Sequence, residues 1–207
     1  MLIHPWDATQ DDAEWREWLT GHDFGQLIAG GAGRDLPVVT PAHFAFDGDR
    51  TIVTHLARPN PIWPLLAEHP RALLTVVDDY TYIRADWNTA AGADPARGVP
   101  TSYYATVQLE GDVRLVDDPA AKAALLDKQL RHFEPDGARA AVSATEAPDR
   151  RLLPGIRGIE FTITGVRAKF KFGGNRTAED RERIATKLAE RGGPLDDQAL
   201  EQLRRRG

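Results

Sequence analysis

The most restrictive feature of this sequence is a succession of strand-like segments that turn signals separate and that never alternate regularly with helices. Residues 24–29, 36–46 and 51–57 are predicted strands, and the breaks at Gly30–Gly33 and Asp47–Asp49 have the composition of hairpin loops. Strands far outnumber βαβ units, which argues against a doubly wound parallel sheet. The order predicts a mainly β protein with peripheral helices, an α+β chain built on a Greek-key or split β-barrel.

The second half of the chain continues this pattern with longer strands. Four further strands are predicted, at residues 72–77, 80–87, 101–116 and 158–172. The first two of these are expected to pair with each other. Residues 88–100 are small, polar and rich in proline and glycine, which predicts a loop. Residues 134–157 are rich in proline, glycine and charge, which predicts a mobile or irregular segment.

Helices are predicted between and around the strands. Four helix starts are indicated by capping-box patterns or by a cap residue before proline: Thr9–Asp12, Asn60–Pro61, Asp118–Pro119 and Thr177–Asp180. The third helix carries Leu126, Leu130 and Phe133 on one face, at helical spacing. The fourth is expected to reach about Arg191, and a final charged helix follows it.

Length and composition limit the classes of protein. The 207 residues suit a split-barrel domain over residues 1–191, with inserted and flanking helices, and a charged C-terminal helix or tail at 192–207. The sequence has no cysteine, which excludes disulfides and thiolate metal sites and fits a reducing cytoplasm. No signal peptide or membrane-spanning stretch is predicted. The net charge of −5 gives no general attraction to DNA.

The first candidate site is the segment THLARPNPIW, where a predicted strand runs into a helix. Thr54, His55 and Arg58 place side-chain donors beside the free backbone N–H groups of a helix N-terminus, an arrangement that holds phosphate. Asn60 and Trp63 of the same segment are also predicted to bind a cofactor. The alternative is structural: Asn60 only caps the helix, His55 is a hydrogen-bonded barrel histidine, and Trp63 belongs to the core.

Two neighbouring segments add candidate groups. Thr40 and His43 lie on the preceding strand, and antiparallel pairing with residues 51–57 brings them beside the first segment. In VPTSYY, Tyr103 and Tyr104 point to opposite faces of a strand, and we take Tyr104 as the one that flanks a planar ligand. Ordinary barrel packing is the alternative for each of these side chains.

Another candidate site follows the last predicted strand, in KFKFGGNR. Period-two alternation puts Lys169 and Lys171 on one face of the strand, and Asn175 and Arg176 then lead into a helix. Two lysines, an arginine and a helix N-terminus suit an anion. The alternative is an exposed edge strand whose lysines discourage aggregation, and we favour the anion site.

Several mechanisms find no motif in the sequence. It contains no nucleotide-binding glycine loop, no closely spaced pair of metal ligands and no nucleophile elbow, so no catalytic residue and no metal site is predicted. No helix-turn-helix is visible. A solvated tail is the preferred interpretation of Arg204–Arg206, with nucleic-acid contact as the alternative.

Taken in order, the segments THLARPNPIW, YTYIRADW, VPTSYY and KFKFGGNRTAEDR resemble the PaiB-type FMN-binding negative transcriptional regulators, over about residues 21–184. The resemblance implies a split barrel of the flavin-reductase and pyridoxamine-phosphate-oxidase kind, with FMN bound at the two-fold interface of a homodimer. The implied pocket takes Thr40, His43, Thr54, His55 and Arg58 from one subunit and Lys169, Lys171, Asn175 and Arg176 from the other.

The sequence departs from that family's pattern at three places near the implied pocket. Arg84–Asn88 stands in place of a Ser-Pro-Ser-Trp-Tyr run, Ser102–Tyr103 in place of Trp-Asn, and Gly173–Gly174 in place of Ser-Gln. Three functions therefore stay open. They are an FMN-binding transcriptional regulator, a flavin-dependent oxidoreductase, and a cofactor-free interaction module.

Overall fold

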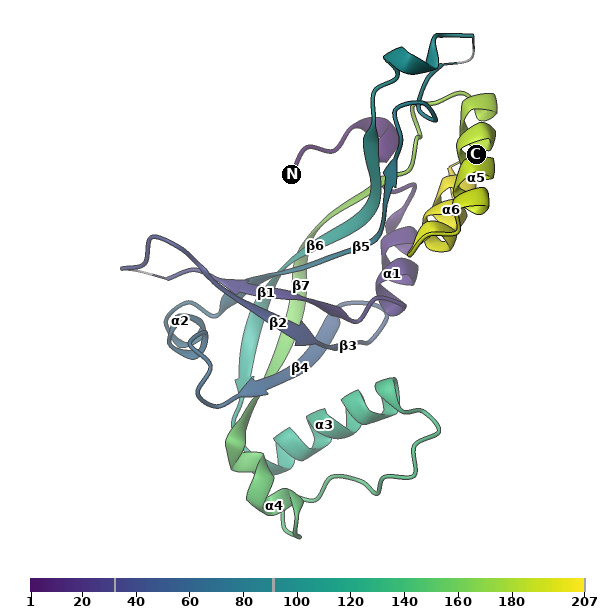
Figure 1. Cartoon of the computed structure of the whole chain (residues 1–207). Helices are drawn as coiled ribbons and strands as arrows, with labels where there is room; N and C mark the ends of the chain where they lie inside the picture. The colour runs from purple at the N-terminus through teal and green to yellow at the C-terminus, as the bar shows by residue number, and fades with distance from the viewer. Residues whose placement is uncertain (32, 91, 207) are drawn as a thin grey trace. The chain divides into compact units, whose positions relative to one another are not determined.

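The structure is a computed structural model that describes residues 1–31, 33–90 and 92–206. Within these residues one seven-stranded sheet has the strand order β2-β1-β5-β6-β7-β4-β3 (Figure 1). The strands are β1 (Phe24–Ala29), β2 (Val38–His43), β3 (Ala45–Phe46), β4 (Thr51–Ala57), β5 (Arg71–Ile83), β6 (Thr101–Val116) and β7 (Ile156–Lys171). Three positions of predicted loops and tail, Ala32, Ala91 and Gly207, lie outside the described residues.

Helices accompany the sheet, and the predicted α+β class is confirmed. The α-helices are α1 (Asp12–Thr20), α2 (Trp63–Glu68), α3 (Pro119–Phe133), α4 (Asp149–Leu152), α5 (Ala178–Arg191) and α6 (Asp196–Arg205). Short 3-10 turns are η1 (Pro5–Asp7), η2 (Pro95–Arg97) and η3 (Leu153–Gly155). Over the part of the chain that the structure describes, every helix is too short or too polar to cross a membrane.

The chain divides into two compact units. The terminal unit comprises Met1–Trp15, Val77–Val107 and Arg167–Gly207, and the central unit comprises Arg16–Val76 and Gln108–Val166. Strands β5, β6 and β7 contribute residues to both units. Each unit is described below by itself.

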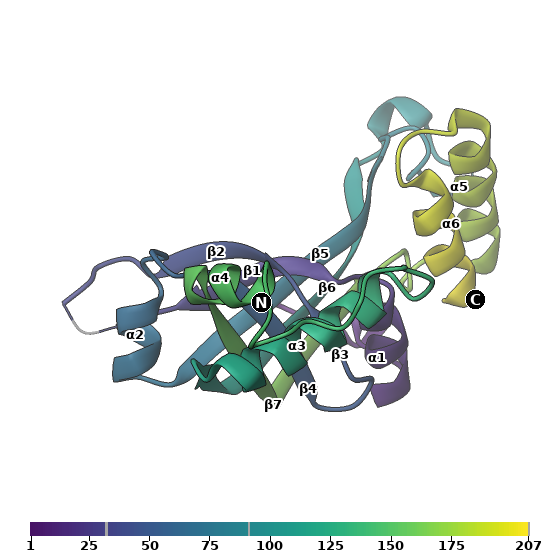
Figure 2. The same cartoon turned by 90° about the horizontal axis from the view of Figure 1, so that it is seen from below.

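The central unit is built from antiparallel strand pairs and one long helix. Strand β1 pairs with β2 and β5, and β4 pairs with β3 and β7. Helix α3 lies against β3 and β4 (Figure 2). A buried apolar cluster joins them, consisting of Ala45, Val53, Val116 and Leu125. Burial of such side chains is the main force that holds the helix on the strands.

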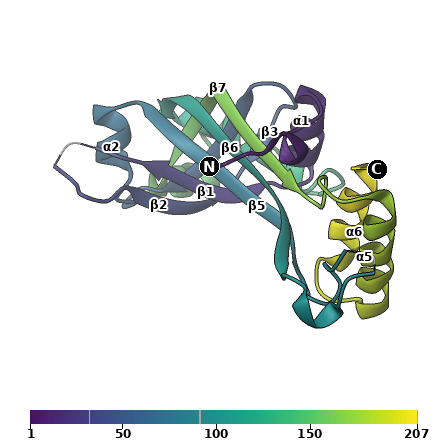
Figure 3. The same ribbon diagram turned by 90° about the horizontal axis from the view of Figure 1, so that it is seen from above.

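In the terminal unit, α5 and α6 lie side by side (Figure 3). The Thr177 hydroxyl accepts a hydrogen bond from the Asp180 N–H at 3.1 Å, which is the N-cap predicted from the sequence. Helix α5 ends at Gly192, whose φ of +56° suits glycine. Helix α6 buries Ala199 and Leu203. These apolar contacts and caps explain why both predicted C-terminal helices form.

The structure corrects two predicted strand boundaries. Residues 72–77 and 80–87 are not a pair of strands, because β5 runs without a turn through Asp79, which has a φ of +53°. The predicted strand 36–46 is interrupted at Phe44, whose N–H donates to a loop carbonyl instead of a ladder partner. Local polarity at Asp78–Asp79 was the misleading signal, since a long strand tolerates one irregular residue.

The apolar face of α3 noted in the sequence is only partly buried, because Leu126 and Leu130 are half-buried. The buried residues of this helix include Lys122, Leu125 and Gln129, whereas Phe133 is 39% exposed. Lys122 Nζ donates to the Leu153 carbonyl at 2.6 Å, and Gln129 Oε1 contacts a histidine described below, while Gln129 Nε2 has no hydrogen-bond partner among the described residues. Burial of a polar group is tolerated once it is hydrogen-bonded, and periodicity of apolar residues alone does not detect this.

At two helices the observed cap or first residue lies a few positions from the predicted one. Asp11, and not Thr9, caps α1, because its carboxylate accepts from the Glu14 N–H at 3.0 Å. Asn60 does not begin α2 directly; its side-chain oxygen accepts from the Ile62 N–H at 3.0 Å, and the helix begins at Trp63. Side-chain turns of this type compete with helix starts in sequence patterns.

The C-terminal residues are not a solvated tail. The Arg206 side chain is 6% exposed, forms an ion pair with Glu14 at 2.5 Å and donates to the Ala8 carbonyl at 2.7 Å. Its guanidinium also lies 5.3 Å from the ring centroid of Phe170. Arg206 therefore joins both ends of the described chain within the terminal unit.

Candidate functional site

The predicted histidine and threonine residues of the central unit bond to other groups of that unit. Thr54 Oγ1 donates to the His43 carbonyl at 2.6 Å, and His55 Nδ1 lies 2.6 Å from Gln129 Oε1. The rings of His43 and His55 meet edge to face with their centroids 5.3 Å apart. These contacts tie β2, β4 and α3 together.

The strand–helix junction that follows uses its donors in the same way. Arg58 Nη1 donates to Asp117 at 2.7 Å, and Trp63 Nε1 donates to a backbone carbonyl at 3.0 Å. Thr40 Oγ1 lies 3.4 Å from Asn60 Oδ1. The side chains predicted at this junction thus support the fold locally, and their part in ligand binding stays a prediction.

Of the remaining predicted residues, all but Tyr104 meet in the terminal unit at a polar cavity of about 290 Å³, called the basic cavity below. Lys169, Lys171, Asn175 and Arg176 all line it. Its other walls come from the N-terminal segment, from residue 88 and from the start of β6. Strand β7 and the turn after it therefore bring together the charged groups that the sequence pattern indicated.

The two lysines of the basic cavity are held in place by other groups of the terminal unit. Lys171 Nζ donates to Thr101 Oγ1 at 2.9 Å, and Lys169 Nζ donates to the Leu2 carbonyl at 3.0 Å. Lys169 also lies 3.6 Å from the buried carboxylate of Asp7. Both ammonium groups are 5.8 Å from the ring centroid of Tyr104. An ammonium group has three donors, so each lysine keeps capacity for a ligand.

Two deeply buried polar atoms of this cavity have no hydrogen-bond partner among the described residues. They are the Tyr103 hydroxyl and the side-chain oxygen of Asn88. Tyr103 is 2% exposed and Asn88 is 7% exposed. Burial raises the pKa of Tyr103 to about 12, against the opposing charges of Arg176 and Arg181, so the phenol is neutral and can donate. Unpaired buried groups are costly, and a cavity that collects two of them is suited to a ligand that satisfies both.

Two glycines make room for this arrangement. A Cβ atom on Gly173 would lie 2.4 Å from the Tyr103 hydroxyl, and one on Gly174 would lie 2.2 Å from the Trp6 carbonyl. Gly173 also has a φ of +70°. The Gly173–Gly174 pair therefore permits both the buried tyrosine and the close approach of the N-terminal segment.

We expect the substitution Gly173→Ala to lower the free energy of unfolding by about 1–3 kcal/mol, from backbone strain and the contact with Tyr103. Gly48→Ala is the matched control, because Gly48 has a φ of +86° and a Cβ atom there would meet no other atom within 4 Å, so it carries the strain alone. Denaturant unfolding of both variants measures the difference. Adding Tyr103→Phe to Gly173→Ala should recover part of the loss, and no recovery would contradict the contact.

The sequence prediction missed several residues of the basic cavity. Trp6 and Asp7 were not singled out, Asn88 and Thr101 lay in segments that were noted but were not chosen as site residues, and Tyr104 was chosen for the ligand in place of Tyr103. Tyr103 is buried, and it also lines the cavity. The available signal was the concurrence of Tyr103 with two glycines at places where the resembled family differs.

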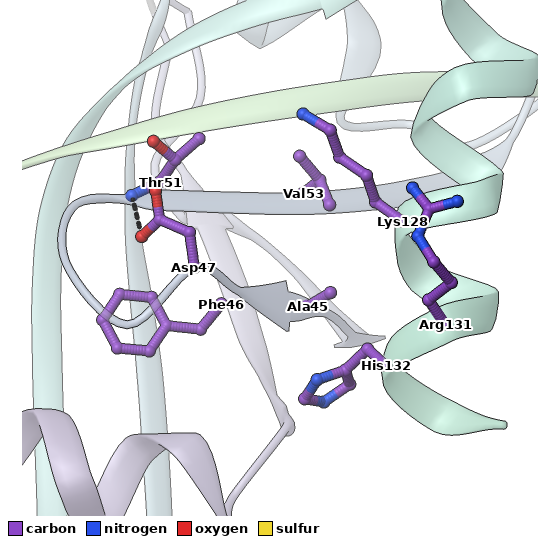
Figure 4. Close-up of a pocket in the computed structure, with 8 residues that line it drawn as sticks. All are labelled: Ala45, Phe46, Asp47, Thr51, Val53, Lys128, Arg131 and His132. Atoms are coloured by element: carbon purple, nitrogen blue, oxygen red, sulfur yellow. Dashed lines mark hydrogen bonds between the residues drawn. The ribbon is translucent and has the colours of Figure 1, made fainter. Parts of the chain in front are cut away.

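A second cavity of about 290 Å³ lies in the central unit between α3 and the β3–β4 hairpin (Figure 4). Lys128 and Arg131 extend over it from α3, and both are exposed. The carboxylate of Asp47 accepts three backbone N–H groups of the hairpin, including that of Thr51 at 2.9 Å. Since its buried polar groups are paired, this cavity carries a weaker indication of a ligand. No cluster of potential metal ligands occurs among the described residues.

The family described as "Putative FMN-binding domain" matches residues 1–165. The chain belongs to this family. The match includes the N-terminal segment, Asn88 and Tyr103, and it ends before the lysines of β7. Comparison with curated proteins gave no match.

Solved structures show the same fold at low sequence identity. The flavocytochrome Anf3 from Azotobacter vinelandii has a TM-score of 0.60 and 19% identity, over 86% of this chain and 75% of that one. The FAD and heme binding protein from Mycobacterium smegmatis has a TM-score of 0.60 and 19% identity, over 86% and 78%. A protein from Bacteroides thetaiotaomicron, named "putative 5-nitroimidazole antibiotic resistance protein", has a TM-score of 0.59 and 14% identity, over 78% of this chain and 84% of that one. The predicted split β-barrel is confirmed.

The groups of the basic cavity fit a flavin. A flavin carries ring carbonyl and N–H groups, and as FMN it adds a phosphate. The cavity offers ammonium and guanidinium donors, a neutral phenol and an unpaired amide oxygen. Its volume is at the small end of the usual range for ligand sites, so it suits one end of such a molecule.

Proposed function

We propose that this chain binds a flavin in the form of FMN, and that the basic cavity holds one part of this cofactor. The observation that carries the proposal is the pair of unpartnered buried atoms on Tyr103 and Asn88, set among three cations. Membership of the family supports the same cofactor class. Bound flavin would supply electron or hydride transfer, and the residues of the chain would bind and orient it.

The charged groups of the cavity and the ring of Tyr104 beside them have definite roles in this proposal. Lys171 and Arg176 supply positive charge, and Lys169 is fixed by Asp7 so that one wall is rigid. The ring of Tyr104 beside the lysines gives an apolar surface. Such fixed donors lower the ordering cost of binding, because few side chains must be immobilised.

The decisive experiment is the absorbance spectrum of the purified protein. We expect the absorbance bands of a flavin, and heating should release that flavin as free FMN. The apoprotein should then rebind added FMN tightly. A colourless protein that ignores added FMN would overturn the proposal and favour the cofactor-free interaction module. Chromatography of the released flavin separates FMN from FAD.

For the activity, we propose a flavin-dependent oxidoreductase. This rests on fold-level likeness to a flavocytochrome and to an FAD and heme binding protein. Consumption of NAD(P)H by the flavin-loaded protein tests it. A PaiB-like negative transcriptional regulator is the second candidate, and the resemblance of the four sequence segments favours it. Binding to its own promoter with a steep salt dependence would support that role.

We also propose that the protein is a homodimer that shares the flavin across its interface. In the arrangement implied by the resemblance, the cavity of one protomer is completed by the Thr54–Arg58 segment of the other. Light scattering at micromolar concentration should give twice the chain mass of 22.9 kDa. A monomer that still binds FMN would contradict the shared site. The cytoplasmic location stays a prediction.

A further inference from the structure

We infer that the basic cavity recognises the imide edge of the flavin's pyrimidine ring, through Asn88 and Tyr103, and does not hold the phosphate. This inference rests on the proposed function and deepens it. An imide edge presents one N–H donor between two carbonyl acceptors. The cavity offers the matching set of one unpaired acceptor and several donors.

Asn88 provides the acceptor. Its side-chain nitrogen donates to the Val99 carbonyl at 2.7 Å, and a carbonyl can only accept, so the orientation of the amide is fixed. The unpaired atom is therefore the oxygen, which needs an N–H or O–H from a ligand. An ionised phosphate or carboxylate has no such proton and would leave this buried oxygen unsatisfied.

Tyr103 provides a donor on the same cavity. Its hydroxyl is held at the wall by the surrounding core, and the Tyr103 ring meets Phe172 edge to face at a centroid distance of 5.9 Å. The phenol can donate to a ring carbonyl beside the N–H that Asn88 accepts. Lys171, which uses one of its three protons on Thr101, has protons left for the second carbonyl.

The walls near these groups suit a flat ring. His4 and Trp6 stack on each other with centroids 4.7 Å apart and ring planes 9° from parallel, and both line the cavity. The main chain at Trp6 passes so close to Gly174 that a side chain there would collide with it. The N-terminal segment thus closes one side of the cavity with an aromatic pair.

Flavin analogues distinguish this inference from a phosphate site. FMN, riboflavin, which lacks the phosphate, and 3-methyl-FMN, whose imide nitrogen carries a methyl group, are titrated against the apoprotein by fluorescence quenching. We expect 3-methyl-FMN to bind at least tenfold more weakly than FMN. Equal binding of FMN and 3-methyl-FMN together with loss of riboflavin binding would place the phosphate in the cavity and overturn the inference.

Variants assign the effect to the two side chains. Tyr103→Phe and Asn88→Ala should each weaken FMN at least about fivefold, and Asn88→Ala should remove most of the preference for FMN over 3-methyl-FMN. Tyr82→Phe is the matched control, because Tyr82 is 48% exposed on β5, and it should leave affinity unchanged. Retained preference in Asn88→Ala, with circular dichroism showing a folded protein, would overturn the role of Asn88. A wild-type protein that binds no flavin would overturn the proposed function itself, which distinguishes that failure from a failure of the imide assignment.

Discussion

Reversing one charge in the basic cavity, by Lys171→Glu, should weaken flavin binding by at least about 30-fold. Lys171 lies at the end of β7 with its ammonium anchored on Thr101, so its charge is fixed at the cavity wall. Removing one charged partner of a half-buried contact costs about 2 kcal/mol or more, and a carboxylate adds repulsion against an electron-rich ligand. Titration of the apoprotein with FMN, followed by fluorescence quenching, measures the loss.

Two further variants make this experiment specific. Lys171→Gln keeps a donor for Thr101 and loses the charge, so its affinity should fall between those of the wild type and Lys171→Glu. Lys128→Glu makes the same reversal at the second cavity and should change FMN affinity by less than about twofold, because exposed charges act weakly. A loss in Lys128→Glu equal to that in Lys171→Glu would contradict the choice of cavity.

Much of the fold could be predicted because local patterns and the final structure agree. The bounds of β1, β4 and β6 coincide with the predicted ranges 24–29, 51–57 and 101–116. Strong alternation and clear turn signals bound these strands on both sides. The prediction of two strands at 72–77 and 80–87 failed because Asp79 interrupts the apolar alternation like a turn residue. In the structure, strand pairing overrides that local signal, and β5 continues through Asp79.

The candidate site was less predictable, because partners decide what a polar residue does. Arg58 and Lys171 look alike in sequence: each follows alternating strand residues and precedes a helix start. In the structure Arg58 is paired with Asp117, whereas Lys171 faces a cavity that also contains unpaired groups. Asn88 was placed near the implied pocket by the departure at Arg84–Asn88, but its role could not be predicted, since that role depends on the Val99 carbonyl that fixes its amide.

The differences from the PaiB-type pattern acquire a physical meaning in the structure. Tyr103 and Gly173 are each unusual for that family, and they are compatible because the absent side chain of Gly173 leaves space for the Tyr103 hydroxyl. Gly174 likewise leaves space for the Trp6 backbone. Changes that fit one another in this way indicate a reshaped cavity and argue against the simple loss of a ligand site.

The buried Tyr103 hydroxyl should make the apoprotein no more stable than a variant that lacks this hydroxyl. Tyr103→Phe removes a buried group that has no partner among the described residues, so the free energy of unfolding should stay equal or rise by up to about 1 kcal/mol. Thermal unfolding without flavin measures this. A large fall in stability would show that the hydroxyl has a structural partner and would weaken its assignment to a ligand.

The stability of the terminal unit should depend most on one buried carboxylate, Asp196, at the start of α6. Asp196 is 1% exposed and accepts hydrogen bonds from Thr81 at 2.6 Å, from Arg191 at 2.7 Å and from the Gly193 N–H at 2.8 Å. It thereby connects β5, the end of α5 and the start of α6. Removing it takes the carboxylate from the buried Thr81 hydroxyl and from the partly buried Arg191 guanidinium, which keeps its hydrogen bonds to Thr81 Oγ1 and to the Tyr82 carbonyl.

We expect Asp196→Ala to lower the free energy of unfolding by about 2–4 kcal/mol, the lower part of the range reflecting the partial exposure of Arg191. The hydrogen bond from Arg191 depresses the pKa of Asp196, against the opposing effect of burial, with Thr81 and Gly193 adding to the depression. A depressed pKa in the folded state means that this stabilisation is complete above the unfolded-state value, near 4, and is lost as pH falls through the folded-state value.

The free energies of unfolding of the wild type and of Asp196→Ala, measured with denaturant, should therefore differ fully at pH 7 and converge in acid. Asp197→Ala is the control, since Asp197 is exposed in the same helical turn and should cost less than about 1 kcal/mol at every pH. A difference that does not shrink in acid would show that Asp196 acts through packing and not through its charge.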